Sequence, residues 1–167
     1  MGELKSLDEY NGQTTDELIA LEGKYDPYSI VWAFEWALLK KWERVGYDKL
    51  AEEERVFLAV KALECEVQNG GYGQFFVNCS DTYAPMIMNA LRRISCLKIA
   101  EITQKAMKIL EDQPMTDEEI ENGTWEENEE REEALRECDD LYYQRPEDYD
   151  KSLFAFVKLN RTGINLP

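Results

Sequence analysis

The sequence predicts an all-α fold in a single domain of several helices. Apolar residues recur three or four positions apart through most of the chain, whereas the alternation typical of strands is almost absent. Capping residues, prolines and glycines stand where these periodic stretches begin and end. With 167 residues and 44% apolar composition, the chain is long enough to bury a core. We therefore expect one helical domain over residues 1–167, with its core within about 26–163.

The first expected helix spans residues 28–45. Asp26 has the position of an N-cap and Pro27 that of the first helical residue, which are common places for these residue types. Apolar side chains occupy several faces of this helix, and Trp32 and Trp36 form a second line on it. A helix that is apolar around much of its girth is expected at the centre of the fold.

The second expected helix spans residues 51–69. Its inward row contains Val56, Val60, Leu63 and Val67. Gly70 and Gly71 end it, because glycine readily adopts the left-handed conformation found at helix ends. A short aromatic helix is expected over residues 72–78.

Two further helices are expected before the acidic part of the chain. The first begins at Ser80 or Asp81 as its cap, carries Pro85 in its first turn and runs through Ser95. The second spans residues 97–110 and has an amphipathic pattern.

The last third of the sequence predicts two more helices. Thr116 and Glu119 have the spacing of a capping box and open the acidic region. Residues 125–143 are expected to form one helix, and the final helix is expected to start at Asp150 and to end near Gly163.

The composition argues against several common functional classes. The chain contains no histidine, which removes the commonest general base and metal ligand. Its four cysteines are widely spaced without a CxxC pair, which is typical of reduced thiols in the cytosol. No secretory signal is visible, and the longest apolar stretch contains Glu35. We expect a cytoplasmic protein with no membrane contact, no metal, no cofactor and no catalytic site.

Negative charge is concentrated in one quarter of the chain. Residues 111–150 hold 18 acids and three arginines, a net charge of −15, whereas all the other residues together carry −1. Such a concentration produces a local field that attracts a basic partner and repels nucleic acid.

The charge density within this segment approaches that of DNA. Residues 126–140 contain nine acids and two arginines. As a helix they extend about 21 Å, which gives one net charge per about 3 Å. One strand of DNA carries one charge per about 3.4 Å. The segment is therefore able to imitate a nucleic-acid backbone, while the alternative is a solvated helix face that only keeps the protein soluble.

The most distinctive local sequence is ECEVQNGGYGQFFVN, residues 64–78. It resembles the E-x-E-V-x-N-G-G-F-x-Q-[FY]-F-x-N signature of a bacterial DNA-mimic protein family, small acidic all-helical proteins formerly classed as a domain of unknown function. Tyr72 stands where phenylalanine is usual and Gln68 where asparagine is common. The resemblance extends over roughly residues 30–160.

This resemblance implies an all-helical acidic protein, often a homodimer. It further implies binding to a DNA-binding protein, such as a transcription factor, in place of DNA.

The signature residues are expected to be structural. They are Glu66, Asn69, Gly70, Gly71, Gln74, Phe75 and Asn78. The glycines permit a sharp reversal, and Glu66 or Asn69 is expected to share hydrogen bonds with Gln74 and Asn78. The functional alternative is a small-molecule pocket at the Gly70–Gly71 junction.

The leading hypothesis is a non-enzymatic protein that blocks the basic surface of a DNA-binding partner. The expected phosphate surrogates are Asp117, Glu118, Glu126, Glu127, Glu129, Glu130, Glu133, Glu137, Asp139 and Asp140. The alternative with the same physics is an immunity or antitoxin protein that neutralises a basic toxin or nuclease.

Overall fold

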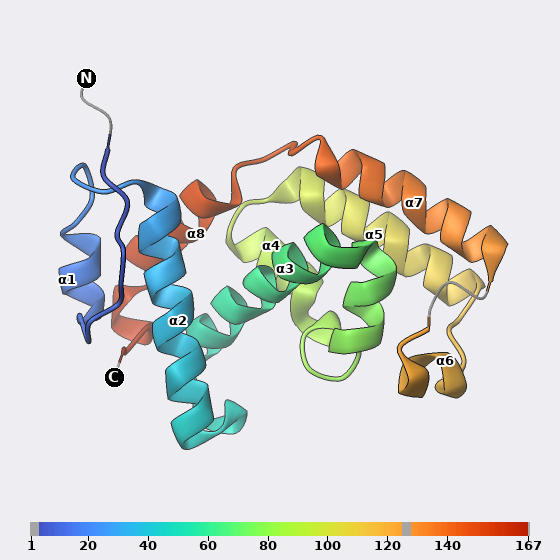
Figure 1. The fold of residues 1–167 in the computed structure, drawn as a ribbon, viewed down its shortest axis with the longest axis horizontal. Helices are drawn as coiled ribbons and strands as arrows, with labels where there is room; N and C mark the ends of the chain where they lie inside the picture. Colours follow the sequence, from blue (N-terminus) through green and yellow to red (C-terminus); the bar gives the residue numbers. More distant parts are fainter. Residues whose placement is uncertain (1–3, 125–127, 167) are drawn as a thin grey trace. The chain divides into compact units, whose positions relative to one another are not determined.

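The computed structural model describes residues 4–124 and 128–166 and is helical, as Figure 1 shows. The α-helices are α1 (Thr15–Ile19), α2 (Pro27–Val45), α3 (Glu52–Cys79), α4 (Ile87–Arg93), α5 (Leu97–Asp112), α6 (Asp117–Asn122), α7 (Glu129–Tyr143) and α8 (Tyr149–Leu159). Short 3-10 helices occupy Tyr47–Lys49, Ala84–Met86 and Arg161–Gly163. Within the described residues, only isolated bridges at Tyr25 depart from helix and loop. The predicted all-α fold class is confirmed.

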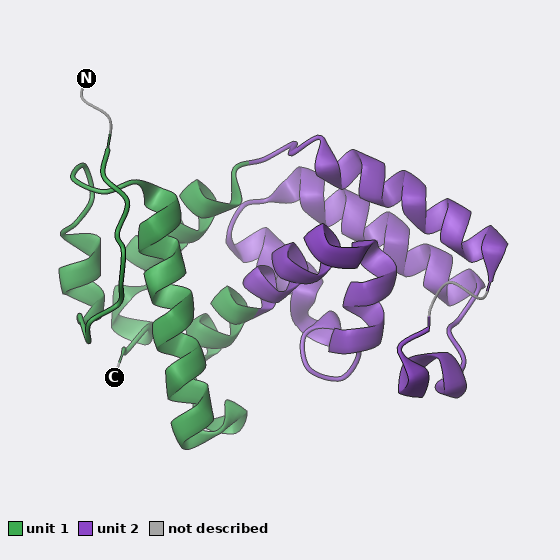
Figure 2. Cartoon of the chain, viewed as in Figure 1, with its two compact units in different colours: residues 1–58, 148–167 green, residues 59–147 purple. Residues whose placement is uncertain are grey.

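The chain divides into two compact units, coloured separately in Figure 2. Unit 1 comprises residues 1–58 and 148–167, and unit 2 comprises residues 59–147. The predicted extent of one domain, 1–167, stays a prediction. In the described part of the chain, no helix combines the length and apolar character needed to cross a membrane.

Unit 1 is built around α2, which packs against α1 and α8. Asp26 caps this helix by accepting from the Ser29 N–H at 2.9 Å, and Pro27 is its first residue, as predicted. The buried face carries Ile30, Phe34 and Leu38. These side chains follow the three- to four-residue period of a helix face, so they form one continuous apolar surface.

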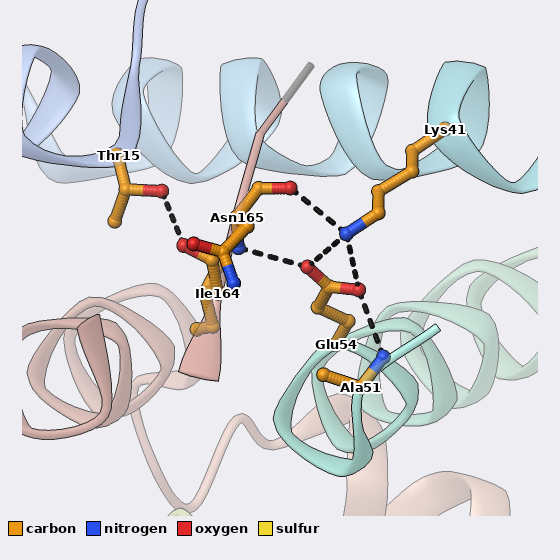
Figure 3. A network of polar contacts seen from close by, with 6 residues as sticks. All are labelled: Thr15, Lys41, Ala51, Glu54, Ile164 and Asn165. Atoms are coloured by element: carbon orange, nitrogen blue, oxygen red, sulfur yellow. Dashed lines mark hydrogen bonds and ion pairs between the residues drawn. The ribbon is translucent and has the colours of Figure 1, made fainter. Parts of the chain in front are cut away.

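A buried charged residue joins the two chain segments of unit 1, residues 1–58 and 148–167, as Figure 3 shows. Glu54 is fully buried, and its carboxylate accepts from Lys41 Nζ at 2.7 Å and 2.9 Å. It also accepts from the backbone N–H groups of Ala51 and Asn165 at 3.0 Å and 2.8 Å. Because every acceptor direction is used, this buried charge is compensated and holds the C-terminal segment against α2 and α3.

Unit 2 contains the rest of α3, followed by α4 to α7. Helix α3 is interrupted at Gly70 and Gly71, which lie outside the helical region of backbone angles. This confirms the predicted break between the helix before the glycines and the aromatic helix after them. Helix α5 packs along α7 and also contacts α4.

Several local expectations are wrong. Neither Ser80 nor Asp81 caps a helix, because α4 begins at Ile87 after the 3-10 turn that holds Pro85. The cap of α8 is Asp148 rather than Asp150, since its carboxylate accepts from the Lys151 N–H at 3.1 Å.

Helix α2 was expected at the centre of the fold, and two of its tryptophans are at the surface. Trp32 is 38% exposed and Trp36 is 44% exposed. Their rings stack on each other with centroids 6.0 Å apart, and Lys40 lies over the Trp36 ring. Self-stacking and the lysine shield these large rings while leaving them outside the core.

Candidate functional site

The acidic helix α7 has one apolar face and one charged face. Asn128 caps it by accepting from the Arg131 N–H at 2.9 Å, and acids fill its first turn, where the helix dipole favours negative charge. Its buried residues are Arg131, Leu135, Cys138 and Tyr142. Their intervals of four, three and four residues place them on one stripe, so the remaining faces are left for charge.

An internal ion pair fixes the beginning of α7. Arg131 is 1% exposed and pairs with Glu119 of α6, which is also buried. Arg131 also donates a hydrogen bond to the Pro114 carbonyl at 3.2 Å. The Arg131 guanidinium, with the backbone N–H of Thr116, lowers the pKa of Glu119 below its usual range. Two charges of the acidic segment are thus used internally and are closed to a partner.

The outer face of α7 carries a row of accessible carboxylates. We call Glu129, Glu133, Glu137 and Asp140 the α7 ridge; all four are exposed. Successive members of the first three lie four residues apart, which is about 6 Å along the axis. Glu130 is exposed beside this row. The structure therefore brings half of the ten predicted surrogates together on one helix.

The few bases near the ridge lie at the surface. Arg136 contacts Glu133 at 2.9 Å, and Lys105 of α5 contacts Glu137 at 2.9 Å. Both carboxylates remain largely exposed, at 74% and 69% of the side chain. Exposed pairs of this kind contribute little free energy, so a partner's cations are able to replace them.

The other predicted surrogates are placed differently. Asp117 and Glu118 are exposed on α6. Asp139 is half-buried, and its carboxylate accepts from the Tyr72 N–H at 2.8 Å. Burial raises the pKa of Asp139 above its usual range. Its carboxylate serves the fold, so we leave it out of the ridge; Glu126 and Glu127 lie outside the described residues.

The signature segment is held by its own hydrogen bonds. Oε2 of Glu66 accepts from Gln74 Nε2 and from Asn78 Nδ2, each at 2.7 Å. Asn69 instead donates to the Cys65 sulfur at 3.5 Å, and Phe75 is buried. The expected network therefore forms through Glu66, on a part-exposed surface. These bonds bridge the break at Gly70 and Gly71 and support a structural role for the motif.

The signature segment also positions α7, a connection that the sequence did not predict. Besides the Asp139 contact with Tyr72, the hydroxyl of Tyr143 donates to the Val67 carbonyl at 2.7 Å. The two contacts flank the break in α3 on either side. Only the fold brings these positions together, since they lie more than 60 residues apart in sequence.

The described residues offer few groups for chemistry. In residues 4–124 and 128–166, no group of three or more Cys, Asp or Glu side chains is arranged to hold a metal ion. Three of the four cysteines are buried, and burial raises the pKa of Cys79 and Cys138 to about 11. Those two thiols are therefore protonated at neutral pH and are poor nucleophiles.

Comparison with known proteins identifies a family. The family model described as DMP19-like protein matches residues 48–160, more than half of the chain. The match includes both the interrupted helix α3 and the acidic helix α7. No curated protein and no solved structure matches the chain.

Proposed function

Because this chain belongs to the DMP19-like protein family, we propose that it binds a basic DNA-binding protein and occupies its surface in place of DNA. In this proposal the protein is not an enzyme, and the α7 ridge supplies the phosphate surrogates. The observation that carries the proposal is the ordered exposure of these carboxylates on one helix.

The spacing of the exposed charges supports the imitation of DNA. From Glu129 to Asp140 the helix rises about 17 Å. The ridge and Glu130 place five exposed carboxylates over this distance. This is one carboxylate per 3–4 Å, approximately the spacing of phosphates along the axis of one DNA strand, about 3.4 Å. Arg136 and Lys105 lower the net charge of this face but leave it negative.

The internal contacts of α7 support binding without a large ordering cost. Arg131 holds one end of the helix to α6, and Tyr143 holds the other end to α3. Preorganised charges lose less conformational entropy on association than charges on an unstructured segment.

The same surface would serve an immunity or antitoxin protein against a cationic toxin or nuclease. Both functions require a basic partner, so the identity of a captured partner distinguishes them. A small-molecule site at the Gly70–Gly71 junction has less support, because Gln74 and Asn78 already donate to Glu66. A homodimer, also implied by the family resemblance, stays a prediction.

The proposal predicts that a variant lacking two ridge acids and the neighbouring Glu130, called the ridge variant, binds the partner more weakly. The variant combines Glu129→Gln, Glu130→Gln and Glu133→Gln, all at exposed positions. The partner is captured from the native cell and eluted with salt, and its Kd is measured over a range of NaCl concentrations. We expect affinity to fall about tenfold or more, because each close charge pair at an interface contributes on the order of 1 kcal/mol or above. The dependence of log Kd on log salt should also become shallower.

A charge-matched control tests whether position matters. Asp8→Asn, Glu9→Gln and Asp48→Asn remove three exposed acids from unit 1. This control should retain most of the affinity, and DNA should compete with the wild-type protein for the partner. Equal losses in the two triple variants, or an unchanged Kd in the ridge variant, would contradict the proposal.

A further inference from the structure

An open apolar groove lies in unit 2 beside the acidic helix α6. The C-terminal end of α3, the 3-10 helix Ala84–Met86, the end of α5 and α6 form its walls. Its apolar lining includes Phe76, Pro85, Met107, Leu110, Met115 and Ile120. Its volume is about 360 Å³, which is ample for one large side chain.

The composition of the lining favours an apolar occupant. Two methionines contribute side chains that adapt to different shapes and contact aromatic rings favourably. Ile120 is 37% exposed although it is large and apolar, so covering it would remove apolar surface from water. Ser80 and Glu111 contribute polar groups to the same lining.

The acids around the groove favour an occupant that is flanked by basic residues. Residues 107–124 contain six acids and one base, Lys108. On α6, Asp117, Glu118 and Glu121 are exposed near Ile120. An apolar floor within an anionic surface attracts an apolar group flanked by lysine or arginine. It disfavours nucleic acid and a second copy of this chain, whose net charge is −16.

We propose that this groove takes an apolar or aromatic side chain that the basic partner presents among its lysines and arginines. The inference rests on the proposed function and adds an anchor to its charges. Helix α6 links the two features, because Ile120 lines the groove while Glu119 pairs with Arg131 of α7. Charge alone attracts many cationic proteins, whereas an aromatic or aliphatic side chain in a pocket contributes binding energy that selects among them.

Two synthetic peptides test the groove without knowledge of the natural partner. Each carries three lysines on either side of a central residue, which is Trp in one peptide and Ser in the other, with blocked ends and a fluorescent label. Fluorescence anisotropy gives Kd values for the full-length protein at low and moderate NaCl. We expect the Trp peptide to bind about tenfold more tightly, since burying a large apolar side chain typically has an effect of this size. That ratio should persist as salt weakens both peptides, because salt screens charge but not apolar burial.

Two variants test whether the preference for the Trp peptide arises in the groove. Met115→Gln combined with Ile120→Asn makes the groove polar at two positions outside the buried core and should bring the ratio to about one. Trp36→Ser removes an exposed aromatic surface in unit 1 and should leave the ratio unchanged. Methyl NMR signals of Met107 and Met115 in the wild-type protein should shift with the Trp peptide and not with the Ser peptide. This last measurement holds even where the double variant folds poorly.

The outcomes separate this inference from the proposed function. Equal Kd values for the two peptides would contradict the groove proposal. So would a Kd ratio that is lost in Trp36→Ser and kept in the groove variant. If both peptides bind with equal Kd values that rise with salt, the result would still agree with the proposed binding of a basic partner. The proposed function fails instead when the ridge variant keeps its affinity for the captured partner, whatever the peptide ratio is.

Discussion

Asp139 and Asp140 are adjacent acids with different surroundings. Asp139 is half-buried and accepts from the Tyr72 N–H, at the start of the helical turn that follows the break in α3. Asp140 is exposed on the α7 ridge. Since α7 turns by about 100° per residue, consecutive side chains point to different faces. One carboxylate therefore supports the fold, while its neighbour is available to a partner.

Alanine substitutions should separate these two roles. Asp139→Ala removes the acceptor for a helix-start N–H and should lower the free energy of unfolding by about 1–2 kcal/mol. Asp140→Ala removes an exposed charge and should change it by no more than about 0.5 kcal/mol. Urea unfolding followed by circular dichroism measures both. Similar losses in the two variants would argue against the capping role of Asp139.

The raised pKa of Asp139 adds a pH dependence. Because burial raises the pKa of this carboxyl in the folded state, its ionisation opposes folding. The stability that it contributes is present below the unfolded-state pKa and declines as pH rises through the folded-state pKa. The Asp139→Asn variant keeps an oxygen acceptor and does not titrate. Its stability should therefore rise relative to wild type as pH increases from the unfolded-state pKa through the raised folded-state pKa, while a constant difference would contradict the assigned burial effect.

Single residues show which part of the site the sequence could predict. Charge counting identified the acidic segment, and the exposed carboxylates of α7 lie within it. Counting could not show that Glu119 and Arg131 neutralise each other in the interior. A signal existed for Arg131, because it shares the helical stripe of Leu135, Cys138 and Tyr142. The contact of Asp139 with Tyr72 had no local signal, since it depends on how α3 and α7 pack.

At the scale of the element, the break in α3 is the feature that places α7. Gly71 has a φ of +75° and a ψ of −175°, a combination that is essentially restricted to glycine. A Cβ added there would lie 2.7 Å from Cγ of Asp139. The missing side chain therefore permits both the backbone turn and the close approach of the capping carboxylate.

Two glycine substitutions should distinguish backbone strain from this collision. Gly46, at the end of α2, has a φ of +88° and a ψ of 154°, and an added Cβ there meets no atom within 4 Å. Gly46→Ala should cost about 1–3 kcal/mol of stability from strain alone. Gly71→Ala should cost more, because the Asp139 carboxylate must also move and release the Tyr72 N–H. Thermal and urea unfolding compare them, and equal costs would show that the collision is relieved without loss.

The helices also show where sequence patterns succeed and fail. The breaks at Gly70–Gly71 and the capping box at Thr116 were predicted because each depends on residues close in sequence. Helix α1 was not predicted, although Thr14 and Glu17 form a capping box. Five helical residues produce too short a periodic pattern to recognise. The exposure of Trp32 and Trp36 was not predicted, because periodicity does not distinguish a buried face from an exposed apolar one.

At the scale of the whole molecule, negative charge is divided unequally between the two units. Residues 59–147 carry 20 acids and nine bases, whereas the residues of unit 1 carry 15 acids and ten bases. Like charges four residues apart on a helix, such as Glu129 and Glu133, destabilise it by tenths of a kcal/mol each. Repulsion between the ridge carboxylates is thus expected to lower the free energy of unfolding, by an amount that depends on ionic strength.

Salt should stabilise the wild-type protein more than a variant that lacks the ridge acids near the end of α7. Raising NaCl from about 10 mM to about 1 M shortens the Debye length from about 30 Å to about 3 Å, which screens repulsion between the exposed acids. Exposed ion pairs weaken too, but they contribute little at any salt concentration. At low salt, a variant with Glu137→Gln and Asp140→Asn, toward the C-terminal end of α7 where the helix dipole also disfavours acids, should melt at a higher temperature than wild type, by about 2–4 °C for each kcal/mol of relieved repulsion. At high salt the two melting temperatures should converge, because the charges removed by substitution are then screened in the wild type. Differential scanning calorimetry over this salt range, with Asp8→Asn combined with Glu9→Gln as the charge-matched control, measures the convergence. A difference that stays constant with salt would mean that the ridge carboxylates do not repel one another, and it would remove the electrostatic basis for treating them as a row of phosphate surrogates.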